Sequence, residues 1–326
     1  MPGCDWTWRG FELALIDQDQ SRVDTPADIT ALPGAPACLL GESPVWMADE
    51  GALWWCDIPG HRLHRWKAAT QQHSSWHFDT DVACCAPLSG AHGGQWLLAQ
   101  RDGLWRFDPA NNSRELLCAP PYNPAQERFN DGRADALGRL WVGTIYEPRD
   151  PALAALYCYA NGQLRRMAGD ITVSNGLAFS PDGATLYWSD TKAHCIHALT
   201  FDISSGAISL QRVFKQFPVK AVNQDLATYG GRPDGAAVDV EGAYWVAMFE
   251  GQRVLRLSPQ GDVLLEVRLP VRYPTMPCFG GADMRTLFIT TALEKSPLDG
   301  APLPLSGCVL SLRVDVPGLP VNFATL

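Results

Sequence analysis

The chain of 326 residues is 46% hydrophobic and 19% charged, which is the composition of a globular protein with a sizeable core. Its net charge of -9 argues against a nucleic-acid-binding protein, because phosphate binding needs clustered Lys and Arg side chains. Twelve Trp, 29 Gly and 25 Pro are typical of many short strands joined by tight turns.

Residues 1–27 are expected to form an N-terminal extension, and residues 28–326 a single domain. The most apolar run of the extension, "FELALI" at 11–16, is too short for a signal sequence or a membrane span. The ten cysteines include no C-x-x-C pair, which indicates reduced thiols in a cytoplasmic protein. A strand near Asp28–Leu32 is expected to pair with the last part of the chain and so remove an open sheet edge.

One pattern recurs six times: a turn, followed by a short apolar strand rich in Trp, Tyr and Leu. The copies are "DEGALWW" (49–55), "HGGQWLL" (92–98), "ALGRLWV" (136–142), "PDGATLYW" (181–188), "VEGAYWV" (240–246) and "ADMRTLFIT" (282–290). A second strand follows each copy, for example "RLHRWK" at 62–67. The copies lie roughly 44 residues apart, except for an insertion between Gly183 and Gly242. The sequence therefore predicts an all-β fold, a six-bladed β-propeller in one domain.

Oxygen-bearing side chains occupy one phase of this repeat in four blades. The first strand of each propeller blade lines the central channel, so these side chains are expected to converge at one mouth of it. The remaining two blades place Cys84–Ala86 and Met276 at this phase. The four residues, each shortly before the turn of its blade, are Glu42, Asn130, Asn175 and Asp234.

Each Asn-Gly or Asp-Gly pair taken alone is also an ordinary turn signal. Four polar residues in register, with Glu42 outside any turn signature, favour a site instead. Two carboxylates and two carboxamides suit a divalent cation such as Ca²⁺, Mg²⁺ or Mn²⁺, and Zn²⁺ or Fe²⁺ could also occupy such a cage. A cation would neutralise Glu42 and Asp234, which explains a carboxylate at the head of a buried strand.

Five segments in order resemble the motifs of the SMP-30/gluconolactonase/LRE family, the regucalcin-like sugar lactonases. The resemblance runs from about Leu39 to the C-terminus. The family fold is a six-bladed propeller with one divalent metal at the mouth of the channel. The segments are "LGESPVW", "RFNDGRAD…GRLWVGT", "SNGLAFSPDG", "RPDGAAVD…GAYWVA" and "PTMPCFGGADMRTLFITTA".

The resemblance implies a role for several residues. It implies that the metal is bound by Glu42, Asn175 and Asp234. It also implies that Arg128 and Asn130 face the substrate. A further substrate contact, Glu147 in "GTIYEPRD", lies one position earlier than the family pattern places it.

Hydrolysis of a sugar lactone such as gluconolactone to the aldonic acid suits this site. The metal would polarise the ring carbonyl and activate a water, and Asp234 is the candidate general base. Arg128 would bind sugar hydroxyls, or alternatively form a surface ion pair with Glu127. Two other functions stay open: hydrolysis of other esters or phosphotriesters, and a non-catalytic calcium- or sugar-binding propeller. No membrane partner is expected, and the protein is expected to be a monomer or a small homo-oligomer.

Other chemistry-bearing residues are expected to be structural. Ser43 lacks the G-x-S-x-G elbow of a serine hydrolase, and the Cys84–Cys85 pair is expected to pack in the core. The insertion between Gly183 and Gly242 is expected to form a loop beside the metal. The histidines are expected at surface positions rather than as ligands: His61, His64, His194 and His197.

Overall fold

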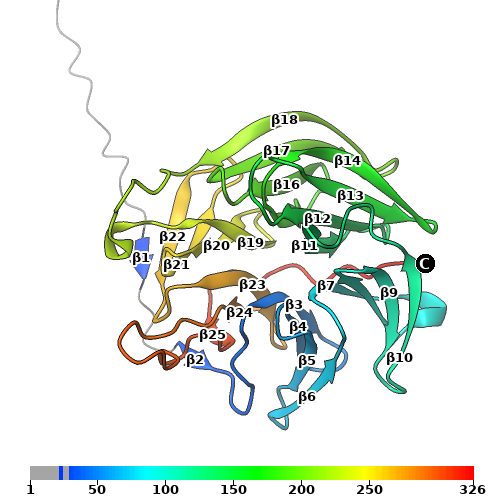
Figure 1. The fold of residues 1–326 in the computed structure, drawn as a ribbon, viewed down its shortest axis with the longest axis horizontal. Coiled ribbons are helices and arrows are strands. Elements are labelled where there is room, and N and C mark those ends of the chain that lie inside the picture. The colour runs from blue at the N-terminus through cyan, green and yellow to red at the C-terminus, as the bar shows by residue number, and fades with distance from the viewer. Residues whose placement is uncertain (1–21, 25–28) are drawn as a thin grey trace, which may run out of the picture.

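The computed structural model describes residues 22–24 and 29–326, which form six sheets around a central channel (Figure 1). In each sheet the consecutive strands that begin at the channel form an antiparallel meander, and blades five and six each add one N-terminal strand at the outer edge. The predicted six-bladed propeller is therefore confirmed. Within the described residues, helix is confined to two 3-10 turns at Gly90–His92 and Leu226–Thr228, and neither could span a bilayer.

The strands of the first three blades follow the chain order. Blade one contains β3 (Gly41–Met47), β4 (Ala52–Asp57), β5 (Arg62–Lys67) and β6 (Gln72–His77). Blade two contains β7 (Val82–Pro87), β8 (Trp96–Gln100), β9 (Gly103–Asp108) and β10 (Ser113–Cys118). Blade three contains β11 (Glu127–Ala134), β12 (Leu140–Tyr146), β13 (Ala154–Ala160) and β14 (Gln163–Ile171).

The last three blades continue this order and add the two N-terminal strands. Blade four contains β15 (Ser174–Phe179), β16 (Thr185–Asp190), β17 (Cys195–Asp202) and β18 (Ala207–Gln216). Blade five contains β19 (Arg232–Val238), β20 (Tyr244–Phe249), β21 (Arg253–Leu257), β22 (Val263–Arg268) and β1 (Arg22–Asp24). Blade six contains β23 (Pro274–Gly280), β24 (Thr286–Thr291), β25 (Leu310–Arg313) and β2 (Thr30–Ala31).

Blade six is built from both ends of the chain. Strand β2 pairs antiparallel with β25 at Thr30↔Ser311 and Ala31↔Leu310. This confirms the expected ring-closing strand, although Asp28 lies outside the described residues, as does most of the expected extension. Strand β1 of that extension pairs parallel with β22 of blade five. The N-terminal segment thus covers outer edges of two neighbouring blades, which protects them from pairing with another chain.

The blades pack on one another through large aromatic side chains. The Trp side chains of the second strands are almost fully buried, for example Trp54 at 1% and Trp188 at 0% exposure. Trp54 and Trp96 of adjacent blades lie 4.6 Å apart between ring centroids. Burial of an aromatic side chain contributes several kcal/mol to folding, so these contacts hold neighbouring blades in a fixed relation.

Every innermost strand contains a register shift close to its start. One additional residue opposes the second strand within Glu42–Val45 of β3 and Asn175–Ala178 of β15, and the other four innermost strands show the same irregularity. A bulge breaks the strict alternation of a strand and re-aims its side chains. The polar residues singled out in the sequence lie at or beside these bulges.

The two mouths of the channel differ. The innermost strands begin at the near mouth. The loops that follow each second strand lie at the same mouth. The insertion adds the loop 217–231, which leads into β19 and therefore lies at the near mouth, as expected. The far mouth is crossed by the C-terminal tail 317–326, drawn in red in Figure 1.

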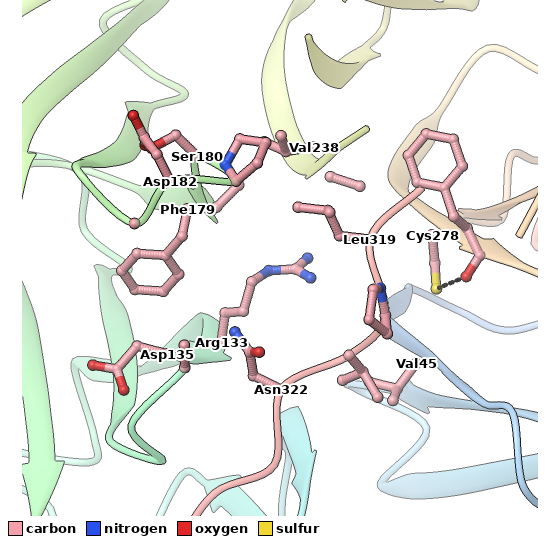
Figure 2. A pocket seen from close by; sticks show the side chains of 18 of the residues that line it. Val45, Arg133, Asp135, Phe179, Ser180, Asp182, Val238, Cys278, Leu319 and Asn322 are labelled. Atoms are coloured by element: carbon pink, nitrogen blue, oxygen red, sulfur yellow. Dashed lines mark hydrogen bonds between the residues drawn. The ribbon is translucent and has the colours of Figure 1, made fainter. Parts of the chain in front are cut away.

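The tail closes the far mouth through contacts with several blades. Thr325 N donates to Gly138 O at 2.9 Å, and Asn322 Nδ2 donates to Ala134 O at 3.2 Å. Between the tail and the ends of the innermost strands lies a cavity of about 280 Å³ with Arg133 in its wall (Figure 2). Arg133 donates to backbone carbonyls of blades four and five, so its charge is held by the scaffold.

Candidate functional site

The four residues that share one phase of the repeat are brought together at the near mouth. All are buried, with exposures between 3% and 7%. Asn130 Nδ2 donates to Asn175 Oδ1 at 2.7 Å, and Asn175 Nδ2 donates to Asp234 Oδ1 at 2.5 Å. Glu42 lies close enough to Asp234 for the charge of one to raise the pKa of the other. Strands β3, β11, β15 and β19 therefore place one polar side chain each around the channel axis.

The two carboxylates of this group are electrostatically strained. Burial raises the pKa of Glu42 well above its ordinary range, and the negative charges of Asp234 and Asp131 raise it further. Burial also raises the pKa of Asp234 to about 8, with Asp131 adding to the effect. The positive charges of nearby arginines lower both pKa values, but they offset only part of the rise. The site therefore holds more negative charge than its own cations neutralise.

Asp131 is a site residue that sequence reasoning missed. It is 4% exposed, and burial raises its pKa. Its Oδ2 accepts a hydrogen bond from Leu177 N at 2.8 Å, whereas its buried Oδ1 has no partner among the described residues. Asp131 directly follows Asn130 and would point away from it in a regular strand. The register shift in β11 after Phe129 lets both residues contribute to the channel.

Arg128 is the buried cation of the site, 8% exposed. Its Nη1 donates to Asn130 Oδ1 at 2.7 Å and to Phe129 O at 2.9 Å. Burial lowers the pKa of its guanidinium, while the charges of Asp81 and Glu147 favour the charged form. Arg128 forms no ion pair with Glu127, so the alternative of a surface pair is wrong. The bonds to Asn130 orient the guanidinium toward the site.

Glu147 lies at the rim of the near mouth, with its side chain 38% exposed. Arg101 holds both carboxylate oxygens, at 3.0 and 2.7 Å, and binds Asp81 at 2.7 Å as well. Arg128 Nε lies 3.7 Å from Glu147 Oε1. The carboxylate is thus fixed beside Arg128 by a planar, bidentate contact.

Four further cations surround this mouth. Arg232 lies two residues before Asp234, and its Nη2 is 3.3 Å from Glu250. Lys220 of the inserted loop is 3.5 Å from the same carboxylate. Lys192 Nζ donates to the backbone oxygen of Arg149, and no carboxylate pairs with either residue among the described ones. This rim therefore carries an excess of positive charge on a chain whose net charge is negative.

The prediction that the histidines lie at the surface is wrong for two of the four. His64 is 2% exposed and His194 is 4% exposed. His194 lies at the near mouth, where its Nε2 contacts the hydroxyl of Tyr229 in the inserted loop. Alternation along a strand does not expose a side chain where loops cover both faces of the blade. Cys84 and Cys85 are buried, as expected.

The residues at the near mouth fit a hard divalent cation. Glu42 accepts only a 3.4 Å bond from Ser43 N, and Asp131 Oδ1 accepts none from the described residues. Buried carboxylates with unused acceptor capacity are costly unless a positive charge compensates them. Carboxylate and carboxamide oxygens are the ligands that Ca²⁺, Mg²⁺ and Mn²⁺ prefer. Glu42, Asn175 and Asp234 are the residues that would hold such an ion.

The fold and the site define a six-bladed β-propeller with a buried, oxygen-rich group of side chains at one mouth of the channel. Residues 40–293 match the family described as SMP-30/Gluconolactonase/LRE-like region, and the chain belongs to this family. The predicted resemblance to regucalcin-like sugar lactonases is therefore confirmed, and with it the prediction of a gluconolactonase-like enzyme.

The chain is similar to individual relatives over most of its length. It is 43% identical over 282 residues to 6-deoxy-6-sulfogluconolactonase of Pseudomonas putida, covering 86% of this chain and 93% of the relative. It is 33% identical to regucalcin of Danio rerio, covering 86% and 93%. The crystal structure of the calcium-binding protein regucalcin from Agrobacterium tumefaciens has a TM-score of 0.82 at 27% identity, covering 94% and 99%.

Proposed function

We propose that the protein hydrolyses a sugar lactone to the open aldonic acid in a reaction that depends on a divalent cation. The observation that carries this proposal is the convergence of three buried carboxylates, Glu42, Asp131 and Asp234, near the propeller axis at the near mouth. A bound divalent cation would polarise the lactone carbonyl and lower the pKa of a water ligand. The lactonase name of a relative with 43% identity supports the same reaction.

The roles of the chain's own residues follow from their contacts. Asp234 accepts the proton of the attacking water, since its carboxylate lies beside the other charged groups of the cage. Arg128 uses Nη1 to hold Asn130, and its Nη2 makes no bond within the described part of the chain. We assign that nitrogen to the hydroxyls of the sugar. Asn130 orients both Arg128 and Asn175, and Glu147 keeps the guanidinium in place from the rim.

The positive rim refines the substrate class. Four cations form this rim: Arg149, Lys192, Lys220 and Arg232. Among the described residues, Glu250 is the only carboxylate that pairs directly with any of them. A lactone with an anionic group on the carbon farthest from the carbonyl would place that group against this rim while its carbonyl faces the cage. The relative named for a sulfonated gluconolactone supports this assignment. We therefore propose an anionic aldonolactone as the preferred substrate.

The experiment is a lactone panel assayed with metal-stripped and metal-restored protein, following release of acid. We expect no turnover without metal, and recovery on addition of Ca²⁺, Mg²⁺, Mn²⁺ or Zn²⁺. We also expect a higher kcat/KM for a 6-sulfonated or 6-phosphorylated lactone than for gluconolactone. Equal rates in the stripped protein would overturn the metal dependence. Turnover of aryl esters or phosphotriesters alone would favour the other hydrolase, and metal binding without turnover of any substrate would favour a binding propeller.

A matched pair of variants tests the rim. Arg149→Gln should lower kcat/KM for the anionic lactones by about tenfold or more and leave gluconolactone nearly unchanged, because one charge-assisted contact is worth about 1.5–3 kcal/mol. Arg313→Gln removes an exposed arginine paired with Asp283 at the outside of blade six and serves as the control.

A cytoplasmic location belongs to the same proposal, because the nine cysteines of the described residues are free thiols.

A further inference from the structure

A second group of metal-binding side chains lies in blade one, apart from the cage at the near mouth. Cys38, Asp57 and His64 are all buried, with exposures of 1%, 5% and 2%. Their ligand atoms lie within 4.8 Å of one another. Cys38 belongs to the segment that leaves β2 and enters blade one, Asp57 ends β4, and His64 lies in β5. Three different elements therefore contribute one ligand type each.

Neighbouring residues hold these side chains in position. Trp55 Nε1 donates to Cys38 Sγ at 3.2 Å. His64 Nδ1 and His73 Nε2 lie 2.9 Å apart in a hydrogen bond. His64 Nε2 is left buried without any partner among the described residues, which is costly for a polar atom. A hydrogen bond from one ring nitrogen that leaves the other free is the usual arrangement of a metal-binding histidine.

Blade four shows which part of this arrangement is only scaffold. Asp57 accepts from Leu39 N and Leu40 N, and Asp190 of blade four accepts from the backbone amides of residues 172 and 173 in the same way. His197 opposes Trp188 in blade four as His64 opposes Trp55 in blade one. The carboxylate cap is therefore common to both blades. The thiol is not, because Ile171 occupies the position of Cys38.

We propose that Cys38, Asp57 and His64 bind a zinc ion that joins the incoming segment to β4 and β5 where the ring closes. Thiolate, imidazole and carboxylate are the ligands that Zn²⁺ takes in proteins. Tetrahedral zinc holds its ligand atoms roughly 3.3–3.8 Å apart, so ligand atoms that lie within 4.8 Å of one another need to close in by at most about 1–1.5 Å on binding. Cys38 gives up its thiol proton when the ion binds, as coordinating thiols do. One position is left for a water.

Sulfur separates this site from the four cage residues Glu42, Asn130, Asn175 and Asp234, whose side chains offer no sulfur ligand. The test uses full-length protein from which all metal has been removed and to which Co²⁺ is then added. We expect a near-ultraviolet thiolate-to-cobalt absorption band in the wild type and in Asp234→Asn. Cys38→Ser should lose the band and keep metal-dependent lactonase activity. Competition with Zn²⁺ should abolish the band in the wild type.

The cobalt-loaded wild type is a first test that does not depend on the folding of any variant, and the variants then assign the sulfur ligand. No thiolate band in the cobalt-loaded wild type would overturn the proposal. A band that persists in Cys38→Ser would also overturn it. Cys158→Ser removes another buried thiol and His197→Gln removes the blade-four histidine; both should keep the band. Loss of the band in either control would place the sulfur ligand elsewhere and overturn the assignment.

Discussion

Replacement of Asp234 by asparagine should have opposite effects on stability with and without metal. In the metal-free protein, burial raises the pKa of Asp234 from its ordinary value of 3.8 to about 8. A carboxyl group whose pKa is higher in the folded than in the unfolded state destabilises the fold progressively as pH rises between the two values. Each pH unit in this window costs about 1.4 kcal/mol, which amounts to on the order of 4 kcal/mol at pH 7.

An asparagine at position 234 does not titrate, so Asp234→Asn should remove part of this penalty. The metal-free variant should be more stable than the metal-free wild type at pH 7 and similar to it at pH 4. Glu42 and Asp131 retain raised pKa values, so a smaller decline with pH remains in the variant. With metal present the order should reverse, because the wild type binds the cation more tightly and is stabilised by mass action.

The assay is chemical denaturation from pH 4 to pH 8, with chelator and with saturating Ca²⁺, together with lactonase rates. Turnover should fall by 10²–10⁴-fold in Asp234→Asn, the range for loss of a general base. Identical pH dependence of the metal-free wild type and variant would refute the electrostatic reasoning. A rate near that of the wild type would refute the role of Asp234 as base.

Three further predictions concern the near mouth. Asn130→Ala should keep the metal but lower kcat/KM by about tenfold or more, because Arg128 loses the acceptor at 2.7 Å that orients it. Metal content measured together with the lactonase rate checks this prediction. A metal-free variant would show that Asn130 is a metal ligand. Deletion within 218–228 retains the buried Phe217 and Tyr229, so it should shift the thermal midpoint little. The deletion should change the relative kcat/KM values among lactones. An unchanged substrate profile would contradict this prediction. Chelator should lower the thermal midpoint of the wild type by several degrees, since an ion at 100 times its Kd contributes about 2.7 kcal/mol.

The architecture could be predicted from the sequence because each blade repeats its own local signal. The turn and the Trp-rich strand recur six times, and every copy falls on a β-hairpin of the structure. The convergence of Glu42, Asn175 and Asp234 followed from counting residues to the next turn. When a repeat has a fixed length, residues at the same position of each repeat occupy equivalent places in the successive blades.

The features that were missed depend on contacts between blades and on irregular backbone. Asp131 reaches the channel only through the bulge in β11, and strict alternation of side chains assigns it to the other face. The burial of His64 depends on the segment at Cys38 that folds over blade one. Strand alternation carries no information about such a covering segment, so the position looked exposed in the sequence.

The C-terminal tail makes the channel a dead end. Because residues 317–326 cross the far mouth and are hydrogen-bonded to blades two and three, a molecule that enters at the near mouth must leave by the same route. Product has to depart before the next substrate can enter, so a slowly leaving acid would compete directly with fresh lactone. The tail also carries the chain end, where Leu326 is 41% exposed, to the outer side of the ring (Figure 1). An affinity tag or a surface anchor attached there would not block the entry of substrate or the release of product at the near mouth.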